Sequence, residues 1–162
     1  MRIRPAQDAD LDAVAAVYAH EVETSISTFD LVPPPRGYWQ ARLSSTEPGD
    51  HLLVADDDGE VLGYAYSSAY RPRPAYLRTR ESSVYLAAGA RGRGVGRLLY
   101  DDLLARLAAD DVHTVVALVA LPNDASLALH RACGFDEVGV MREVGHKHGR
   151  WVDTAWLQRM LP

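Results

Sequence analysis

Apolar residues recur at helical spacing early in the chain and predict an amphipathic first helix. A short strand is expected over residues 3–5, after which Asp8 or Asp10 can cap the helix. The apolar face of that helix consists of Leu11, Val14, Val17, Tyr18 and Val22. Residues 24–35 are polar and end in three prolines, which predicts a loop. A second, short helix is expected over residues 38–43.

The middle of the chain combines apolar runs with turn-forming residues, as β-strands and their connections do. Residues 52–55 and 61–66 flank the sequence Asp56-Asp57-Asp58-Gly59, which predicts a β-hairpin. The prolines of residues 71–74 interrupt the sheet, because proline cannot donate a ladder hydrogen bond. Residues 82–87 then resume it as a strand.

A glycine-rich stretch leads into a second helical pattern, followed by further strands. The leucines that mark this helix are Leu98, Leu99, Leu103, Leu104 and Leu107. Residues 112–121 predict a buried strand, residues 124–133 a helix, and residues 135–144 and 151–157 two closing strands. This order predicts a single α/β domain over residues 1–162, with a mixed central β-sheet flanked by helices.

Composition narrows the class of protein. Hydrophobic residues make up 48% and charged residues 24% of the chain, which are values of an ordinary globular domain. The net charge of −5 argues against a nucleic-acid-binding surface, which needs a basic excess. No apolar run is long enough to span a membrane. No apolar signal region follows Met1. The single cysteine, Cys133, suits a reducing compartment. We therefore expect a cytoplasmic protein that binds neither nucleic acid nor membrane.

The most informative segment runs from residue 84 to residue 99, where a strand enters a glycine-rich turn that opens a helix. Unpaired backbone N–H groups at a helix N-terminus attract anions, and glycines let the backbone approach a phosphate. Arg91, Arg93 and Arg97 add positive charge, so a pyrophosphate is the expected guest. The alternative is a surface loop whose glycines merely turn the chain. The Walker and dinucleotide-binding patterns do not fit, because Lys and a hydroxyl are missing after Gly96 and the turn lies past mid-chain.

The pattern Arg91-x-x-Gly94-x-Gly96 resembles the coenzyme A pyrophosphate loop of the GCN5-related N-acetyltransferase (GNAT) superfamily, whose order of elements this chain also matches. The resemblance implies a GNAT fold and acetyl-CoA as co-substrate, with the strand before the loop beside the pantetheine arm. The residues expected to bind acetyl-CoA here are Tyr85, Leu86, Ala87, Arg91, Gly92, Arg93, Gly94, Val95, Gly96 and Arg97.

A second pattern, Asn123-Asp124-x-Ser126-x-x-x-His130-x-x-x-Gly134-Phe135, resembles the second signature of the superfamily. It implies that Asn123 and Ser126 contact the cofactor. It also implies that His130 faces the cofactor thiol, at a position usually held by Tyr.

Four segments resemble the phosphinothricin acetyltransferase family and its relatives that acetylate methionine sulfoximine and methionine sulfone. They are Glu23-Thr24-Ser25-x-x-x-Phe29, Tyr76-x-x-Thr79-x-Glu81-x-Ser83-Val84-Tyr85, Leu121-Pro122-Asn123-Asp124-x-Ser126-x-x-x-His130 and Gly145-x-Lys147-His148-Gly149-x-Trp151-x-Asp153. The chain departs from the family pattern at Leu77, Arg78 and Arg80.

The family resemblance implies the roles of the remaining site residues. Glu81 would act on the acceptor amine, directly or through a water, because an ammonium has no lone pair with which to attack. His130 would protonate the departing thiolate. The residues expected to hold a small amino-acid-like acceptor are Phe29, Arg71, Arg73 and Tyr76. Without the resemblance, Glu81 could be an ion-pair partner of Arg80, His130 a core histidine, and the two arginines a solubilising pair.

The family also forms homodimers, for which Trp151, Trp156 and Leu157 could supply apolar surface. We expect no metal, because His146 and His148 lack a third ligand, and we expect Cys133 to be a packing residue. Two rival functions stay open: a GNAT enzyme that acetylates a protein N-terminus, a lysine or a polyamine, and a non-catalytic acetyl-CoA-binding sensor.

Overall fold

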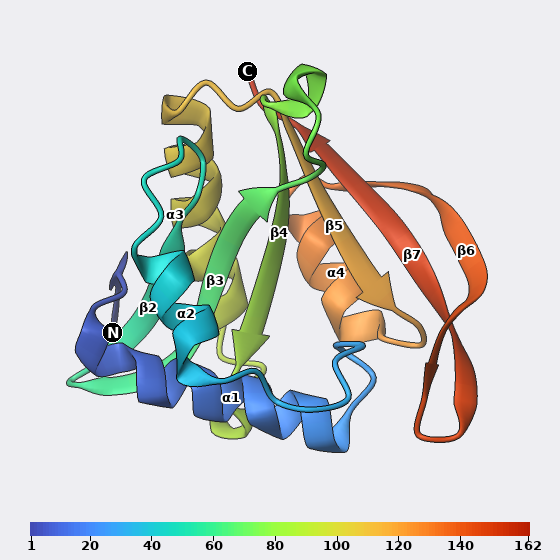
Figure 1. Cartoon of the computed structure of the whole chain (residues 1–162), viewed down its shortest axis with the longest axis horizontal. Coiled ribbons are helices and arrows are strands. Elements are labelled where there is room, and N and C mark those ends of the chain that lie inside the picture. The colour runs from blue at the N-terminus through green and yellow to red at the C-terminus, as the bar shows by residue number, and fades with distance from the viewer.

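The computed structural model describes residues 1–162, which form one seven-stranded mixed sheet of order β1-β2-β3-β4-β5-β7-β6, with helices on both faces (Figure 1). The strands are β1 (Arg2–Pro5), β2 (Leu52–Asp57), β3 (Glu60–Ala69), β4 (Thr79–Leu86), β5 (Thr114–Ala120), β6 (Asp136–Lys147) and β7 (Arg150–Met160). The helices are α1 (Leu11–Thr24), α2 (Arg36–Leu43), α3 (Val95–Ala109) and α4 (Asp124–Ala132). Each helix and strand expected from the sequence is present, so the predicted α/β fold is confirmed.

The start of α1 differs from the expectation in its detail. A single 3-10 turn (Asp8–Asp10) precedes the helix, and the Asp10 carboxylate accepts a hydrogen bond of 2.7 Å from the Gln7 backbone N–H. The same carboxylate binds Arg4, with 2.7 Å between Nη1 and Oδ2. Asp10 therefore holds the N-cap position of α1 without a capping bond from its side chain, and its carboxylate completes the capping box of the preceding turn. Asp8 lies in that turn without capping α1.

Two apolar clusters fill the space on opposite faces of the sheet. On one face, α1 and α2 pack over β2 and β3 around the fully buried Trp39 and Tyr64. On the other, α3 packs over β2, β3 and β4, and its buried leucines share one cluster with residues of β5 and β7 and with Cys133. Leu98 is the exception among the predicted apolar positions of α3, since it is 44% exposed. The burial of Cys133, which is 2% exposed, confirms its packing role.

The parallel neighbours β4 and β5 pair over only three residues, from Thr79–Thr114 to Glu81–Val116. Beyond this point the two strands diverge, while each continues to pair with its other neighbour, β3 or β7. Backbone groups of β4 that would face β5 are thus left without a strand partner at a seam inside the sheet. Helix α4 lies beside this seam (Figure 1), and the start of α3 reaches it.

Candidate functional site

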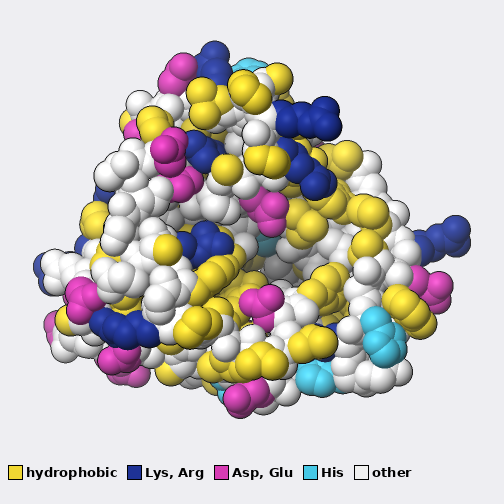
Figure 2. All heavy atoms as spheres, viewed as in Figure 1, with side chains coloured by type: hydrophobic (Ala, Val, Ile, Leu, Met, Phe, Trp, Pro, Cys, Tyr) yellow, Lys and Arg dark blue, Asp and Glu magenta, His cyan; other side chains and the backbone are white.

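A cavity of about 680 Å³ occupies the seam between β4 and β5. Its walls come from residues 82–86 of β4, the start of α3, residues 118–120 of β5 and one face of α4, while the end of α1 and the following loop close one side. In the space-filling view a hollow opens near the middle of the sheet face, with acidic and basic side chains near its rim (Figure 2). The predicted cofactor segments therefore meet in one place, although they lie far apart in the sequence.

The glycine turn has the geometry that an anion site needs. Gly92 and Gly94 adopt the left-handed region, with φ of +73° and +80°, which side chains other than glycine rarely tolerate. Gly94 is the N-cap of α3, so the first N–H groups of the helix have no partner within the helix. Gly96 has an ordinary φ, but a Cβ added there would lie 2.9 Å from Leu129 Cδ2. The turn therefore presents open backbone donors and closely packed walls.

Each of the three arginines of the turn forms an ion pair with a carboxylate. Arg91 binds Glu21, Arg97 Nε lies 2.8 Å from Asp101 Oδ1, and Arg93 Nη2 lies 3.7 Å from Asp57 Oδ2. Arg91 and Arg97 line the cavity. Arg93 does not, and Ala87 is also outside the lining.

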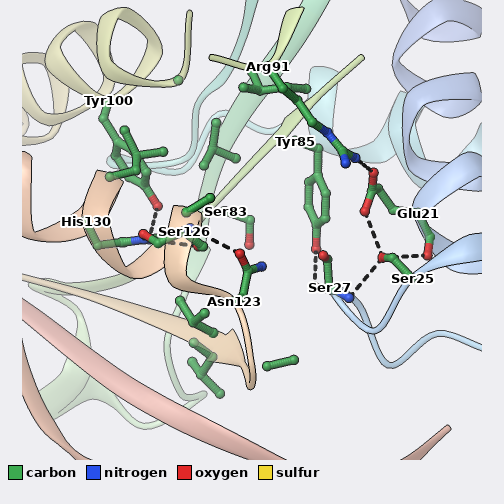
Figure 3. Close-up of a pocket in the computed structure, with 18 of the residues that line it drawn as sticks. Glu21, Ser25, Ser27, Ser83, Tyr85, Arg91, Tyr100, Asn123, Ser126 and His130 are labelled. Carbon is green, nitrogen blue, oxygen red and sulfur yellow. Dashed lines mark hydrogen bonds and ion pairs between the residues drawn. The ribbon is translucent and has the colours of Figure 1, made fainter. Parts of the chain in front are cut away.

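Glu21 is a cavity residue that the sequence analysis missed. Its side chain is 5% exposed and accepts hydrogen bonds from Arg91 and, at 2.7 Å, from the Ser25 hydroxyl (Figure 3). The Ser27 backbone N–H donates in turn to Ser25 Oγ at 3.0 Å. This network ties the glycine turn to the loop that begins at Ser25. A signal was available, because Glu21 follows Tyr18 by three residues on the apolar stripe of α1, where an acid needs a partner.

His130 lies on α4 at the cavity wall, and its side chain points towards α3 (Figure 3). The Nδ1 atom is 2.7 Å from the Ser126 carbonyl oxygen, and Nε2 is 2.8 Å from the Tyr100 hydroxyl. The residue is 4% exposed, and this burial lowers the pKa of the imidazole despite the bond to Ser126. Asn123 and Ser126 also line the cavity, and the Asn123 side chain caps α4 by accepting from the Ser126 N–H.

Glu81 stands at the closed end of the seam, on the last β4 residue that pairs with β5. It is half-buried and does not line the cavity, whereas Ser83, two residues on and on the same face of β4, does. Burial raises the pKa of its carboxyl group, and the positive charges of Arg71 and Arg42 oppose this shift. Arg80 binds Asp50 instead of Glu81, so the ion-pair alternative for Glu81 does not hold.

The residues predicted to hold the acceptor lie outside the cavity lining. Arg71 and Tyr76 both contact Tyr70, with the Arg71 guanidinium 5.1 Å from the Tyr70 ring centre and the two tyrosine rings 5.4 Å apart. The side chains of Arg71, Arg73 and Tyr76 are all exposed. Two of the positions that depart from the family pattern are also on the surface. Arg78 forms an ion pair with Asp111, with 2.5 Å between Nη2 and Oδ1, and Leu77 is 65% exposed.

Phe29 is held by the hairpin of β6 and β7. Its ring lies so close to Gly145 that a Cβ at this glycine would overlap the Phe29 ring. Next to it, the buried Lys147 ammonium donates to the Thr28 carbonyl at 2.8 Å, and burial lowers the pKa of Lys147. The loop over residues 25–29 is therefore fixed at both ends, by Glu21 and by this hairpin.

No three His, Cys, Asp or Glu side chains in the structure lie together in a way that could hold a metal ion. The His146 ring lies tilted against Trp151, with 4.8 Å between the ring centres, and His148 lies 3.3 Å from the Ser25 carbonyl oxygen. None of the four helices has the length and apolarity to cross a membrane.

Residues 14–135 match the acetyltransferase (GNAT) family. The chain belongs to this family. The matched segment covers the glycine turn, the seam and α4, so the superfamily resemblance and the GNAT fold predicted from the sequence are confirmed.

Curated relatives of this GNAT enzyme extend over almost its whole length. It is 47% identical over 161 residues to the phosphinothricin N-acetyltransferase of Alcaligenes faecalis, covering 98% of this chain and 82% of the relative. It is 38% identical to the L-methionine sulfoximine/L-methionine sulfone acetyltransferase of Pseudomonas aeruginosa, covering 96% and 92%. The protein is an acyltransferase.

Two solved structures superpose closely on the fold. The phosphinothricin acetyltransferase of Sinorhizobium meliloti in complex with acetyl-CoA has a TM-score of 0.94 and 40% identity, covering 99% of this chain and 88% of that one. The ribosomal-protein-alanine N-acetyltransferase of Brucella melitensis has the same TM-score and 36% identity, covering 99% and 100%. Of these two relatives with the same fold, one is named for a small-molecule acceptor and the other for a protein acceptor.

Proposed function

We propose that this protein transfers the acetyl group of acetyl-CoA to the amine of a small amino-acid-like acceptor of the phosphinothricin or methionine sulfone/sulfoximine type. The observation that carries the proposal is the position of Glu81, a half-buried carboxylate with a raised pKa at the closed end of the seam. The names of the curated relatives support the acceptor class. We further propose that residues 1–162 work as one catalytic domain in the cytoplasm, in detoxification.

Acetyl-CoA fits the cavity by the chemistry of its walls. The open N–H groups at the start of α3 suit a pyrophosphate, and the free edge of β4 over residues 82–86 offers backbone partners for the amides of the pantetheine arm. Arg91 and Arg97 flank this site, and Asn123 and Ser126 lie at its opposite wall. When bound, acetyl-CoA supplies the acetyl group and a thiolate leaving group.

Glu81 is proposed as the base, directly or through a water. A free amino-acid ammonium is mostly protonated at neutral pH, so a base within reach contributes about 10²–10⁴-fold to the rate. The raised pKa of Glu81 brings its basicity closer to that of the amine, which improves proton transfer. His130 is proposed to act on the departing sulfur from the α4 side of the cavity.

Arg71 and Arg73 are proposed to bind the acidic end of the acceptor, since guanidinium pairs well with carboxylate and phosphinate oxygens. The positive charge of Arg71 lowers the pKa of Glu81 against the effect of burial, which supports the placement of Arg71 beside the reacting amine. Phe29 and Tyr76 would flank the acceptor. Movement of the exposed 71–78 segment towards the cavity is part of this proposal.

A substrate panel tests the acceptor class. Amino acids and their sulfone, sulfoximine and phosphinate analogues are expected to release coenzyme A thiol from acetyl-CoA, and Arg73→Ala is expected to raise KM for an anionic acceptor while leaving acetyl-CoA affinity unchanged. Arg78→Ala is the matched control on the same segment, because Arg78 binds Asp111. Faster turnover of spermidine than of any amino acid in this panel would contradict the proposal.

Acetylation of a protein N-terminus is the second candidate, favoured by the likeness to the ribosomal-protein-alanine N-acetyltransferase of Brucella melitensis. Peptides beginning with alanine belong in the same panel. Turnover of these peptides without turnover of free amino acids would favour this candidate. Acetyl-CoA binding without turnover of any acceptor would favour a non-catalytic sensor.

We also propose a homodimer. Apolar side chains gather on β6 and β7, where Val138, Val140 and Trp151 are 65%, 45% and 62% exposed. The sequence-based choice of surface was wrong for Leu157, which is 1% exposed, because its side chain points into the core beneath α3. Light scattering at micromolar concentration is expected to give twice the chain mass, and Val138→Asp combined with Trp151→Asp is expected to halve it. A monomer mass for the unaltered protein would refute the dimer.

A further inference from the structure

Tyr100 and His130 form a buried pair beside the cavity. Tyr100 on α3 is fully buried, His130 is 4% exposed, and their rings meet edge to face at 5.1 Å. Phe135 closes the pair from the third side, with its ring 5.5 Å from Tyr100 and 5.2 Å from His130. The only other polar side chain near the tyrosine hydroxyl is Ser82 on β4, whose Oγ is 3.4 Å away. All three polar residues line the cavity, as Figure 3 shows for Tyr100 and His130.

The hydrogen bonds of His130 determine where its proton is. The Ser126 carbonyl oxygen can only accept, so Nδ1 carries a hydrogen. Burial lowers the pKa of the imidazole, which is therefore neutral near pH 7 and has a lone pair at Nε2. The Tyr100 hydroxyl must then donate to Nε2 at 2.8 Å. No charged side chain hydrogen-bonds to His130, and the titratable groups beside it are Tyr100 and the buried Cys133.

We propose that Tyr100 is a positioning residue: the Ser126 carbonyl fixes the Nδ1–H tautomer of His130, and the Tyr100 hydroxyl stabilises Nε2 in both protonation states. A hydroxyl, unlike a methyl or a carbonyl, can donate to a bare Nε2 and accept from a protonated one. When Nε2 gains a proton, the hydrogen bond between it and Tyr100 reverses, and the Tyr100 hydrogen turns towards Ser82 Oγ. The Ser82 hydroxyl, which donates to Tyr100 while His130 is neutral, then becomes the acceptor. The inference rests on the proposed function only in that it assigns His130 to the reaction.

This geometry also restricts how His130 acts on the thiolate. In the resting tautomer no proton is present on Nε2, so His130 becomes a donor at that atom only after Nε2 has taken up a proton, which the acceptor nitrogen releases in the same turnover. Losing the tyrosine hydroxyl removes an acceptor from the protonated state and a donor from the neutral state. The charged state loses more, because hydrogen bonds to charged groups are the stronger ones.

Tyr100→Phe tests the proposal, since it removes one oxygen and keeps the ring. It is expected to lower kcat by about 10–100-fold, the equivalent of one hydrogen bond to a charged group, with unchanged acetyl-CoA affinity. NMR titration is expected to move the midpoint of His130 to lower pH. Tyr64→Phe is the matched control, because Tyr64 is equally buried and its hydroxyl has no partner. It should change neither kcat nor the His130 midpoint.

A double-mutant cycle separates positioning from a general structural effect. In a His130→Ala background, Tyr100→Phe is expected to cost nothing further in kcat, because the group it positions is gone. Multiplicative losses, or an unmoved His130 midpoint, would overturn the proposal. Full activity of His130→Ala would instead refute the catalytic role of His130, while the NMR midpoint in Tyr100→Phe would still decide whether Tyr100 controls its proton.

Discussion

Glu81→Gln is expected to lower kcat/KM by about 10²–10⁴-fold at neutral pH and to leave acetyl-CoA affinity unchanged. Gln keeps the size and one hydrogen-bonding oxygen of Glu but cannot accept the proton of an ammonium. Glu81 lies outside the cavity lining, where β4 and β5 still pair, so its replacement should not alter the groups that bind acetyl-CoA. Steady-state kinetics and calorimetry with acetyl-CoA measure the two quantities.

The pH dependence of this loss gives its mechanism. Because burial raises the pKa of Glu81, wild-type activity should fall as the pH drops through that raised value, and this limb should be missing from the Glu81→Gln profile. The loss should shrink as the pH approaches the pKa of the amine, since free base then forms unaided. Glu60→Gln, at the exposed start of β3, is the control. Near-wild-type activity of Glu81→Gln from about pH 6 to about pH 9 would make Glu81 structural and His130 the next candidate base.

Gly96→Val is expected to have the second-largest effect, on acetyl-CoA binding. A Cβ at Gly96 would meet Leu129 Cδ2 at 2.9 Å and Leu86 Cδ1 at 3.6 Å, and both leucines line the cavity. Overpacking of this kind costs about 1–3 kcal/mol. If the leucines relieve the clash by moving into the cavity, the affinity falls by roughly 5–150-fold.

Gly89→Val is the matched control for the glycine turn. Gly89 lies in the same loop, but nothing is within 4 Å of its added Cβ and it does not line the cavity. Calorimetry should therefore give wild-type acetyl-CoA affinity for Gly89→Val, and a thermal melt shows whether each variant is folded. Unchanged affinity in a folded Gly96→Val protein would mean that the turn does not bind the pyrophosphate.

The fold was predictable from the sequence because its elements have clear periodicity. The leucines of α3 and the apolar run of β5 are long enough to identify each element, and the Asp56–Gly59 segment identifies a hairpin. Strand lengths were less predictable. β6 continues to Lys147, and β7 starts at Arg150, so both strands extend beyond their expected bounds. Cross-strand pairing extends them through residues that have no apolar alternation.

The candidate site was predictable where one contiguous segment builds it, as in the glycine turn. It was not predictable where distant segments meet. Tyr100 follows Leu99 on the apolar face of α3 and looks like an ordinary core residue, and only the packing of α3 against α4 brings it to His130. Glu21 was missed for the same reason, since its partner Arg91 is 70 positions away. Arg71 and Arg73 were assigned through family resemblance, and the structure leaves them outside the cavity lining.

The irregular edge of β6 restricts the way in which two copies of this chain could associate. β6 is an outermost strand, and its pairing with β7 shifts register between Glu137 and Gly139 and again between Met141 and Gly145. Such bulges twist the free N–H and C=O groups of the edge strand out of line. This protects the exposed edge from pairing edge to edge with further copies, which would build a fibre. Association through this region would therefore bury the face of the two strands and stop at a closed pair, instead of continuing the sheet from one molecule into the next.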